Sequence, residues 1–335
     1  MKIKLTDLEE KITKGIEKLG YQGEDATIIR EVLLYAEMRG NNQGVSKIAT
    51  GGVPPASEIE PFQIAKENKC GVLLSGGHSM VTTTKAADKA FALAAEHGVG
   101  VACTNHTHTS SGAIGYFARR ISKAGYIGFI TVGNGDFRAV APLGSAEPML
   151  GTNPLAYAFP YEGGEVVFDI ATAAIAFFGV VEAKLKGESL PENVALNADG
   201  QMSTNPNEVM EDKDGEHVGG AIMPFAGHKG YGLSVFVQLM GSAFSLAGSP
   251  GVNEEDGAGT FIIAIDPALF ADKDEYMKRA RALVDQIKSA KPIAGQEVLL
   301  PGERGDRRAA QVMQTGEIEI ADGVWNKLCE FVESE

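Results

Sequence analysis

The chain has 335 residues, of which 44% are hydrophobic, and its formal net charge at pH 7 is −14. A chain of this length can bury a substantial core in two or three domains. The acidic balance argues against nucleic acid and anionic membrane as partners, because both require a basic face. We find neither an apolar run of about 18 residues nor a signal-peptide core, and the three widely spaced cysteines fit reduced thiols, so we expect a cytoplasmic protein.

The N-terminal segment is predicted to form two helices. Apolar residues on one helical face define the first: Leu5, Leu8, Ile12, Ile16 and Leu19. Thr6 and Glu9 have the spacing of a capping box at its start. The second helix is expected over residues 24–38, and the glycine- and asparagine-rich turn at 39–44 should end it.

A strand is predicted at 71–74, followed by a glycine-rich turn with His78 and a helix over 84–97. His78 either contacts a ligand or simply belongs to the turn before the helix, and we favour the second interpretation. A second strand at 99–103 runs into Asn105-His106-Thr107-His108. Cys103 is interpreted as a small buried strand residue rather than a nucleophile.

The two histidines at 106 and 108 have two chemical interpretations and a structural one. On a strand, residues two apart point to the same face, so both rings could bind one metal ion. The other histidines, at 78, 97, 217 and 228, show no second paired spacing, so we predict no metal site. An imidazole with a near-neutral pKa suits acid–base chemistry. Either ring could instead be structural.

The remaining elements are predicted by periodicity and turn residues. They are strands at 126–132, 166–168 and 261–265, helices at 116–118, 173–184, 233–247, 274–289 and 324–332, and a polar excursion at 191–220. The last helix should pack on the N-terminal helices. Glycines and Lys229 at 227–232 suit a pyrophosphate, although a lysine at a helix start needs no ligand. No G-x-G-x-x-G motif follows a strand, which disfavours an ordinary Rossmann site.

Five short motifs occur in one order along nearly the whole chain. They are Asn-x-x-His at 105–108, Gly-Tyr-x-Ala at 115–118, Gly-Thr-Asn-Pro at 151–154, Asp-x-Ala-Thr at 169–172 and Gly-x-Lys-Gly-Tyr-Gly-Leu at 227–233. Together they resemble the malate/L-lactate dehydrogenase family of the second type, whose relatives include ureidoglycolate, sulfolactate and diketogulonate oxidoreductases and cyclic-imine reductases. The resemblance implies an α/β (α+β) fold with a non-Rossmann dinucleotide-binding domain built on a largely antiparallel sheet. Residues 121–289 would form this NAD(P)-binding domain, and residues 1–120 with 290–335 a helical, substrate-side domain.

The resemblance also implies roles for individual residues. His108 would exchange the proton, and His106 would support it or take its role. The cofactor, NAD or NADP, would be bound by Asn134, Gly151, Thr152, Asn153, Asp169, Ile170, Ala171, Lys229, Gly230, Gly302, Glu303 and Arg304. Two of these have ordinary alternatives, since Asp169 could be a helix N-cap and Arg304 a solvated surface residue.

The turn after the second helix departs from the family pattern at two positions. Gln43 replaces a histidine to which the family assigns proton donation, and Lys47 replaces an arginine that holds the substrate carboxylate. Glutamine donates a hydrogen bond but supplies no proton. Lysine keeps the positive charge without the bidentate fork. We therefore take Lys47, Gln43 and Arg39, which begins the turn, as substrate-binding candidates.

The sequence predicts an NAD(P)-dependent oxidoreductase that moves a hydride between nicotinamide and a small 2-oxo or 2-hydroxy carboxylate. If His108 is the sole acid, its loss should lower turnover by about two to four decades. A cyclic-imine carboxylate reductase is the first alternative, because Gln43 leaves a ketone without its usual acid. A metal-dependent hydrolase using His106 and His108 is the second, and a non-catalytic binding module the third. We expect a homodimer, and the choice between NADH and NADPH stays open.

Overall fold

A computed structural model describes residues 1–210, 212–213, 216–217 and 219–334. The helices are α1 (Leu5–Lys18), α2 (Gly23–Met38), α3 (Ser46–Ala49), α4 (Ser79–His97), α5 (Gly115–Lys123), α6 (Phe177–Lys186), α7 (Pro206–Val209), α8 (His228–Gln238), α9 (Lys273–Lys288), α10 (Glu303–Thr315) and α11 (Asp322–Glu333). Short 3-10 turns lie at Ala56–Glu58 (η1), Glu254–Asp256 (η3) and Pro267–Leu269 (η4), and a π-helical turn, Leu239–Phe244 (η2), extends α8.

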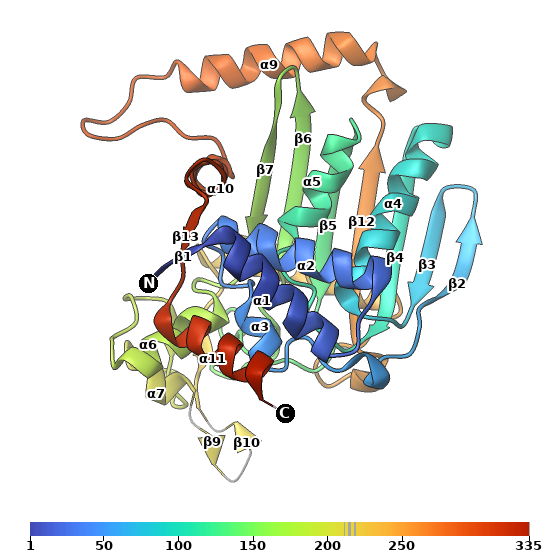
Figure 1. Ribbon diagram of the computed structural model, residues 1–335. Helices are drawn as coiled ribbons and strands as arrows, with labels where there is room; N and C mark the ends of the chain where they lie inside the picture. The colour runs from blue at the N-terminus through green and yellow to red at the C-terminus, as the bar shows by residue number, and fades with distance from the viewer. Residues whose placement is uncertain (211, 214–215, 218, 335) are drawn as a thin grey trace.

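The strands are β1 (Lys2–Lys4), β2 (Gln63–Asn68), β3 (Gly71–Ser75), β4 (Val99–Thr107), β5 (Ile127–Gly133), β6 (Leu155–Tyr161), β7 (Gly164–Ile170), β8 (Ala195–Leu196), β9 (Asp212–Lys213), β10 (Glu216–His217), β11 (Ala221–Ile222), β12 (Ala258–Ile265) and β13 (Glu317–Glu319). Seven of those described form one sheet in the order β2-β3-β4-β12-β5-β6-β7 (Figure 1). Only the β3–β4 pair within it is parallel. The expected mixed α/β fold with a largely antiparallel sheet is confirmed.

The pairing directions decide which strand ends meet. Because β12 is antiparallel to both β4 and β5, these two strands run the same way. Two further antiparallel steps, through β6, give β7 that direction as well. The carboxyl ends of β3, β4, β5 and β7 therefore lie at one edge of the sheet, and the loops that follow them gather there.

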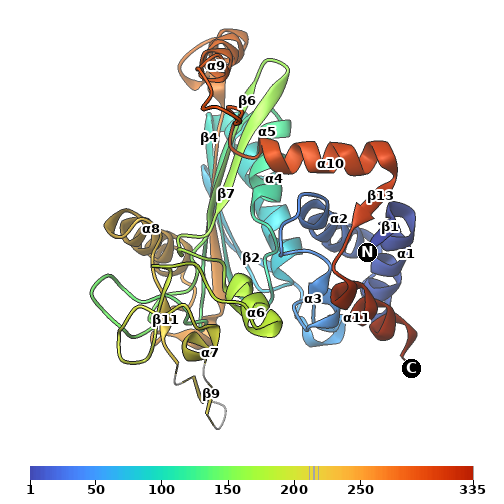
Figure 2. The ribbon, with the colours of Figure 1, turned by 90° about the vertical axis from the view of Figure 1, so that its left-hand side faces the viewer.

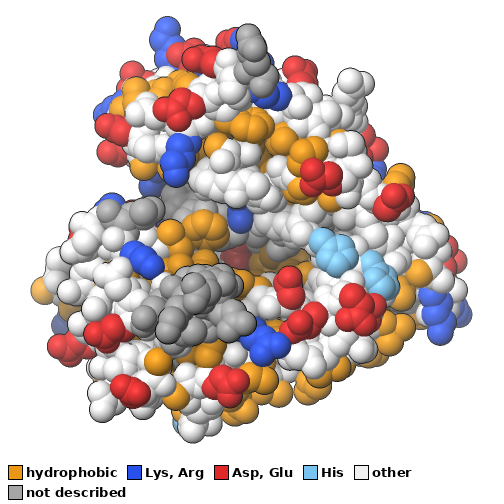
Figure 3. All heavy atoms as spheres, turned by 90° about the horizontal axis from the view of Figure 1, so that it is seen from below, with side chains coloured by type: hydrophobic (Ala, Val, Ile, Leu, Met, Phe, Trp, Pro, Cys, Tyr) orange, Lys and Arg blue, Asp and Glu red, His pale blue; other side chains and the backbone are white. Residues whose placement is uncertain are grey.

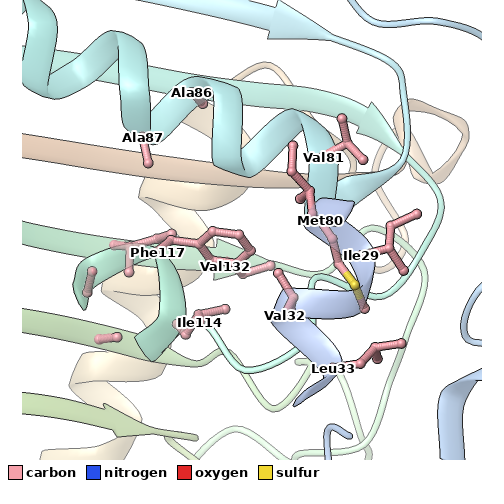
Figure 4. Close-up of a cluster of buried hydrophobic side chains, with 14 of the residues drawn as sticks. Ile29, Val32, Leu33, Met80, Val81, Ala86, Ala87, Ile114, Phe117 and Val132 are labelled. Carbon is pink, nitrogen blue, oxygen red and sulfur yellow. The ribbon is translucent and has the colours of Figure 1, made fainter. Parts of the chain in front are cut away.

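Helices cover both faces of the sheet. Figure 2 shows α2, α4 and α5 on one side and α8 on the other. The main core lies between α2, α4, α5 and the sheet, where Val32, Met80, Ile114 and Phe117 are at most 1% exposed and point toward one another (Figure 4). Small alanines on α4, including Ala86 and Ala87, let that helix approach β4 and β12 closely. A second apolar cluster, around Val140, Val180 and Ile222, supports the chain between β7 and α8.

The two ends of the chain lie together in a helical layer outside this core (Figure 1). β1 pairs with β13, and α1 packs against α11. The Met1 ammonium is 2.6 Å from an oxygen of Asp322, and Lys11 Nζ is 2.6 Å from Glu333. α11 also contacts the short helix α3. The predicted packing of the closing helix on the N-terminal helices is confirmed.

Several local predictions were wrong. Thr6 lies inside α1, whose N-cap is Lys4 without a side-chain hydrogen bond, so there is no capping box at that end. Helix α4 starts at Ser79, five residues before the expected position, because His78 caps it. Helix α6 starts at Phe177 rather than 173, so Asp169 is a residue of β7 and not the N-cap of that helix. Part of the predicted excursion at 191–220 is buried, since Ala195 and Leu196 form β8; its residues 211, 214, 215 and 218 lie outside those described. No helix in the described ranges has the length and apolar character needed to span a bilayer.

Candidate active site

A cavity of about 490 Å³ opens at the sheet edge where the strand ends meet. Its walls come from the ends of β4, β5 and β7, the start of β12, the first turn of α4 and the turn between α2 and α3. Aromatic side chains from the start of α6, Phe177 and Phe178, close one side. Figure 3 shows one face of the molecule, which is hollowed between two lobes, with hydrophobic side chains in the hollow and most charged side chains around its rim.

Lys47 is the cation of this cavity. Its side chain is 5% exposed, and Nζ lies 5.2 Å from the centre of the Phe178 ring. Within the described part of the chain, Nζ has no carboxylate or hydrogen-bond partner. Burial lowers the pKa of Lys47 to about 8. An ammonium held without a counter-ion in a cavity is poised to bind an anionic ligand.

Glu37 of α2 holds the turn that leads into α3 and Lys47. The Glu37 carboxylate accepts a hydrogen bond from the Val45 amide (3.0 Å), and burial raises its pKa. Gly44 lies directly against this carboxylate, so a Cβ at position 44 would overlap Glu37 Oε2. Gln43, at the tip of the turn, lines the cavity and donates from Nε2 to Asn42 (3.3 Å). The tip of the turn therefore presents to the cavity an amide, which can donate a hydrogen bond but no proton.

Asp169 is the acidic group of the cavity. It lies near the end of β7 and accepts a hydrogen bond from the Gly115 amide (2.8 Å), at the first residue of α5. Burial raises the pKa of Asp169 to about 6. A carboxylate at a helix N-terminus is stabilised by the amides there, so Asp169 joins β7 to α5 while its side chain faces the cavity.

A second cavity, of about 390 Å³, adjoins the first and shares Asn41 and Asp169 with it. Two arginines line it, and both are paired. Arg119 makes a bidentate contact with Asp306 (both distances 2.6 Å) and lies 2.9 Å from Glu165. Arg39 lies 3.1 Å from Asp306, and its guanidinium carbon is 3.9 Å from the centre of the Tyr35 ring. We call Arg39, Arg119, Glu165 and Asp306 the paired ion cluster.

The structure brings many of the predicted site residues together. Those lining the first cavity are Gln43, Lys47, Asn134, Thr152, Asp169, Ile170 and Ala171. Arg39 and Gly302 line the second cavity with Asp169. Gly151 lies against Asn134, where a Cβ would overlap the Asn134 amide, and Asn153 is buried, donating to Ser234 (3.0 Å).

Other predicted residues lie away from both cavities. Gly230 and the exposed Lys229 belong to the first turn of α8, which begins five residues earlier than expected. Arg304 is exposed on α10. A hydrogen bond from Lys288 holds the pKa of Glu303 at about 2, and the same carboxylate accepts from the Leu300 amide (3.0 Å).

The two candidate histidines are exposed and line neither cavity. β4 continues to Thr107, beyond the predicted end at 103, and His106 has a left-handed backbone (φ 51°) within it. His106 Nδ1 is 3.7 Å from an oxygen of Asp256, whereas His108 lies against Gly257. Figure 3 shows histidine side chains at the surface beside acidic ones. Among the described residues, no group of three or more histidine, cysteine or acidic side chains is arranged to hold a metal ion.

Two interpretations of buried groups are confirmed. His78 accepts a hydrogen bond from the Met80 amide through Nδ1 (3.2 Å) and caps α4, and burial lowers its pKa to about 4. Cys103 is 7% exposed in β4, and burial raises its pKa to about 12, which keeps the thiol protonated.

Sequence reasoning did not single out several lining residues. The hydroxyls of Ser79, Thr109 and Ser110 face the first cavity, as do the rings of Phe177 and Phe178. Ser79 is tied to Thr109 by two hydrogen bonds, of 2.8 and 2.7 Å. Arg119 and Asp306 belong to unremarkable helical patterns. A short run of hydroxyl residues at 109–111 was the one local signal available for this wall.

Comparison with known proteins decides the family. Residues 3–329 match the family model described as malate/L-lactate dehydrogenase. The chain belongs to this family. It is 31% identical over 332 residues to the L-sulfolactate dehydrogenase of Methanocaldococcus jannaschii, covering 94% of this chain and 92% of that protein. It is 32% identical over 339 residues to the malate/(S)-sulfolactate dehydrogenase of Methanothermus fervidus, covering 96% and 94%.

The fold agrees with that of a solved structure. The sulfolactate dehydrogenase from Methanocaldococcus jannaschii superposes with a TM-score of 0.83 and 30% sequence identity, over 99% of this chain and 96% of that one. As a malate/L-lactate dehydrogenase family member, the chain is an NAD(P)-dependent dehydrogenase of the kind that acts on the CH–OH group of 2-hydroxy acids. The family assignment disfavours both the hydrolase and the binding-module alternatives.

Proposed function

We propose that this family member interconverts small 2-oxo and 2-hydroxy monocarboxylates, with Lys47 binding the substrate carboxylate. The observation that carries the proposal is the buried Lys47 ammonium, which has no anionic partner among the described residues. A substrate carboxylate would supply the missing counter-ion. In a site shielded from water, such an ion pair is much stronger than at the surface.

The charge of the cavity favours a substrate with one negative charge. Among the described lining residues, Lys47 is the only cation and Asp169 the only acid. A dicarboxylate or a sulfonated 2-oxo acid would bring a second charge that this wall does not match. The rings of Phe177 and Phe178 favour an apolar substituent on the 2-oxo acid instead.

We propose that the cofactor binds across the two adjoining cavities. Asn134, Thr152 and Asp169 to Ala171 would hold it in the first, and Gly302 in the second, where a Cβ would overlap the Val167 carbonyl and the backbone can approach closely. When bound, the nicotinamide supplies or accepts the hydride. The chain's own part is to fix the substrate by its carboxylate and to exclude water from the reacting atoms.

A substrate panel tests this function. Purified protein is assayed with NADH and with NADPH against pyruvate, a branched 2-oxo acid, oxaloacetate and 3-sulfopyruvate, with absorbance of the reduced nicotinamide as the signal. We expect the two monocarboxylates to exceed the dianions by about tenfold or more in kcat/KM. A preference for oxaloacetate or sulfopyruvate would contradict the charge argument, and no turnover of any 2-oxo acid would contradict the function.

The position of Gln43 favours a second candidate, reduction of a cyclic imine carboxylate. An imine nitrogen is already protonated in solution near neutral pH, so its reduction needs less help from an acid than that of a ketone. Delta-1-piperideine-2-carboxylate in the same panel tests this candidate. Turnover of the ketones alone would eliminate it.

We also propose that the protein is a homodimer. Large apolar side chains are exposed along α8 and the π-helical turn, at Leu233, Phe236, Leu239 and Phe244, with 38 to 59% of each in solvent. Such a contiguous patch is typical of an interface. Light scattering on a chromatography peak measures the mass, and Phe244→Glu should shift it toward the monomer. The assignment of residues 121–289 to cofactor binding likewise stays a proposal, since the sheet takes strands from both sides of residue 120.

A further inference from the structure

We propose that the Lys47 ammonium, besides binding the carboxylate, is the acid that protonates the substrate oxygen during reduction. This inference rests on the function proposed above, because it requires a 2-oxo acid in the first cavity. It replaces His108, to which the family resemblance gives that role, with a residue that faces the cavity.

The titratable groups of the cavity leave few candidates. Among the described lining residues, Lys47 and Asp169 alone carry a side chain that exchanges protons in the neutral range. With a pKa of about 6, the Asp169 carboxyl is mostly ionised at neutral pH, and one of its oxygens already accepts the Gly115 amide at 2.8 Å, so it is the weaker acid of the two above pH 7. Gln43 supplies no proton.

The backbone and the side-chain stem of Lys47 are held in place by their neighbours. Its stem packs against Gly52, where a Cβ would lie 2.9 Å from Lys47 Cβ. Its backbone amide donates to the Gly44 carbonyl (3.3 Å), and its carbonyl accepts from the Val53 amide (3.1 Å). Among the described residues, Nζ contacts the Phe178 ring, 5.2 Å from its centre, and has no hydrogen-bond partner at the cavity wall.

The charged groups around Lys47 leave its ammonium free to titrate. Glu37 of α2 is engaged with the Val45 amide, and Asp169 of β7 with α5. α1 and α11, which also pack on α3, contribute no ionisable residue to the described lining. Burial therefore dominates and brings the pKa of Lys47 to about 8, close to the pH at which an acid–base group works best.

One ammonium can serve both the carboxylate and the carbonyl of a 2-oxo acid. The two oxygens can lie on the same side of the molecule, and the three N–H groups of Nζ can reach both. As the carbonyl carbon receives a hydride from the reduced nicotinamide, the C=O π bond breaks and its electron pair takes a proton from Nζ. The products are the 2-hydroxy acid, oxidised nicotinamide and a neutral Lys47 amine, which regains its proton from water. Oxidation runs the same step in reverse, with the neutral amine as base.

The pH profile of the unmodified enzyme gives the first test. Reduction requires the ammonium, so kcat/KM should be constant below pH 8 and fall about tenfold per pH unit above it. Oxidation requires the neutral amine and should rise toward a plateau above pH 8. In kcat the inflection should move upward, since a bound carboxylate stabilises the ammonium. An inflection between about 6 and 6.5 in both directions would assign the proton to Asp169 or to an imidazole and overturn the proposal.

Lys47→Arg separates binding from proton transfer. Arginine keeps the charge but stays protonated at all working pH values. We expect KM within about fivefold of the wild-type value, kcat lowered by about 10² to 10⁴, and no inflection near pH 8. A variant that keeps kcat within threefold overturns this inference while leaving the proposed function in place. Absence of 2-oxo acid turnover in the wild type removes both.

A measurement independent of turnover covers the case in which arginine does not fit. NMR of protein with isotope-labelled lysine, with the Lys47 signal assigned by its absence in Lys47→Arg, follows the side-chain amine between pH 6 and 11 without cofactor or substrate. A midpoint near 8 supports the proposal, and a midpoint above 10 overturns it. His108→Ala is expected to keep the inflection near pH 8, and its loss in that variant would return the role to the imidazole.

Discussion

Lys47 and Arg119 are buried cations on opposite sides of Asp169, and they have opposite electrostatic surroundings. Arg119 meets two carboxylates in the paired ion cluster, at 2.6 Å from Asp306 and 2.9 Å from Glu165. Lys47 meets none among the described residues and faces an aromatic ring. A buried charge is costly unless it is paired. The paired cation therefore holds the fold together, whereas the unpaired one lowers stability, which fits the ligand-binding role proposed for it.

Replacing Lys47 with methionine should have the largest effect on activity of the changes considered. The variant loses the counter-ion for the substrate, so we expect kcat/KM for 2-oxo acids to fall by about 10³ or more. Stability should stay the same or rise by about 1 kcal/mol, because a desolvated charge is removed. Steady-state kinetics measure kcat/KM, and urea unfolding of the same preparation measures stability. A large loss of stability would contradict the view that Lys47, unlike Arg119, does not stabilise the fold.

Arg119→Met should do the reverse. It leaves Glu165 and Asp306 facing each other without their shared cation, and we expect unfolding free energy to fall by about 3 kcal/mol. Asp306 is 38% exposed on its side chain, which keeps the value at the low end for a buried pair. If denaturant unfolding shows a change under 1 kcal/mol, the cluster is not structural.

A third change acts on the support under the unpaired cation. Gly44→Ala puts a methyl group into the Glu37 carboxylate, which must move and release the Val45 amide. We expect a loss of about 2 kcal/mol in stability and about tenfold in kcat/KM, since Lys47 would shift with the turn. Gly323→Ala is a matched control for stability, because position 323, like position 44, lacks a left-handed backbone, and an added Cβ there has no neighbour within 4 Å.

The last change is at the acid that lines both cavities, and its effect depends on pH. Burial raises the folded-state pKa of Asp169 to about 6, above its ordinary value of 3.8. The folded state therefore binds more protons than the unfolded state between about pH 4 and 6, and stability falls as pH rises through this window. Asp169→Asn should stabilise the protein by up to about 3 kcal/mol at pH 7, the equivalent of a two-unit pKa shift, and by nothing below pH 4. A pH-independent difference would show that the carboxylate does not titrate there.

The hydrophobic periodicity of the sequence predicted the helices and strands that have a regular apolar face. Helices α2 and α11 and strands β5 and β12 lie close to their expected positions, because each packs an apolar face on the core, whereas α9 was predicted although only Val284 of it is buried. The start of α4 was missed because its cap is a histidine, which accepts the Met80 amide as a serine or asparagine would. Strand β2 was not predicted, because all six of its residues are exposed in an edge strand and their sequence does not alternate between apolar and polar residues.

The sequence predicted the candidate site residues that belong to short motifs, but not which way each side chain points or which charged groups pair. Short sequence patterns singled out Gln43, Lys47 and Asp169, and all three line the first cavity. Sequence could not show that the imidazoles at 106 and 108 are exposed, since the left-handed backbone of His106 interrupts the alternation of β4. Nor could it show which buried cations are paired, because Arg119 and Asp306 are 187 residues apart.

The meeting of the two chain ends has a consequence for how the enzyme is made. Helix α3, which bears Lys47, rests on α11, which is synthesised after the strands of the central sheet, and β1 pairs with β13. The sheet can be completed once β12 has been synthesised, but the lysine gains its support about sixty residues later. Nascent chains that stop short of α11 thus possess the central sheet yet lack the support of α3, which ties the proposed role of Lys47 to the synthesis of α11.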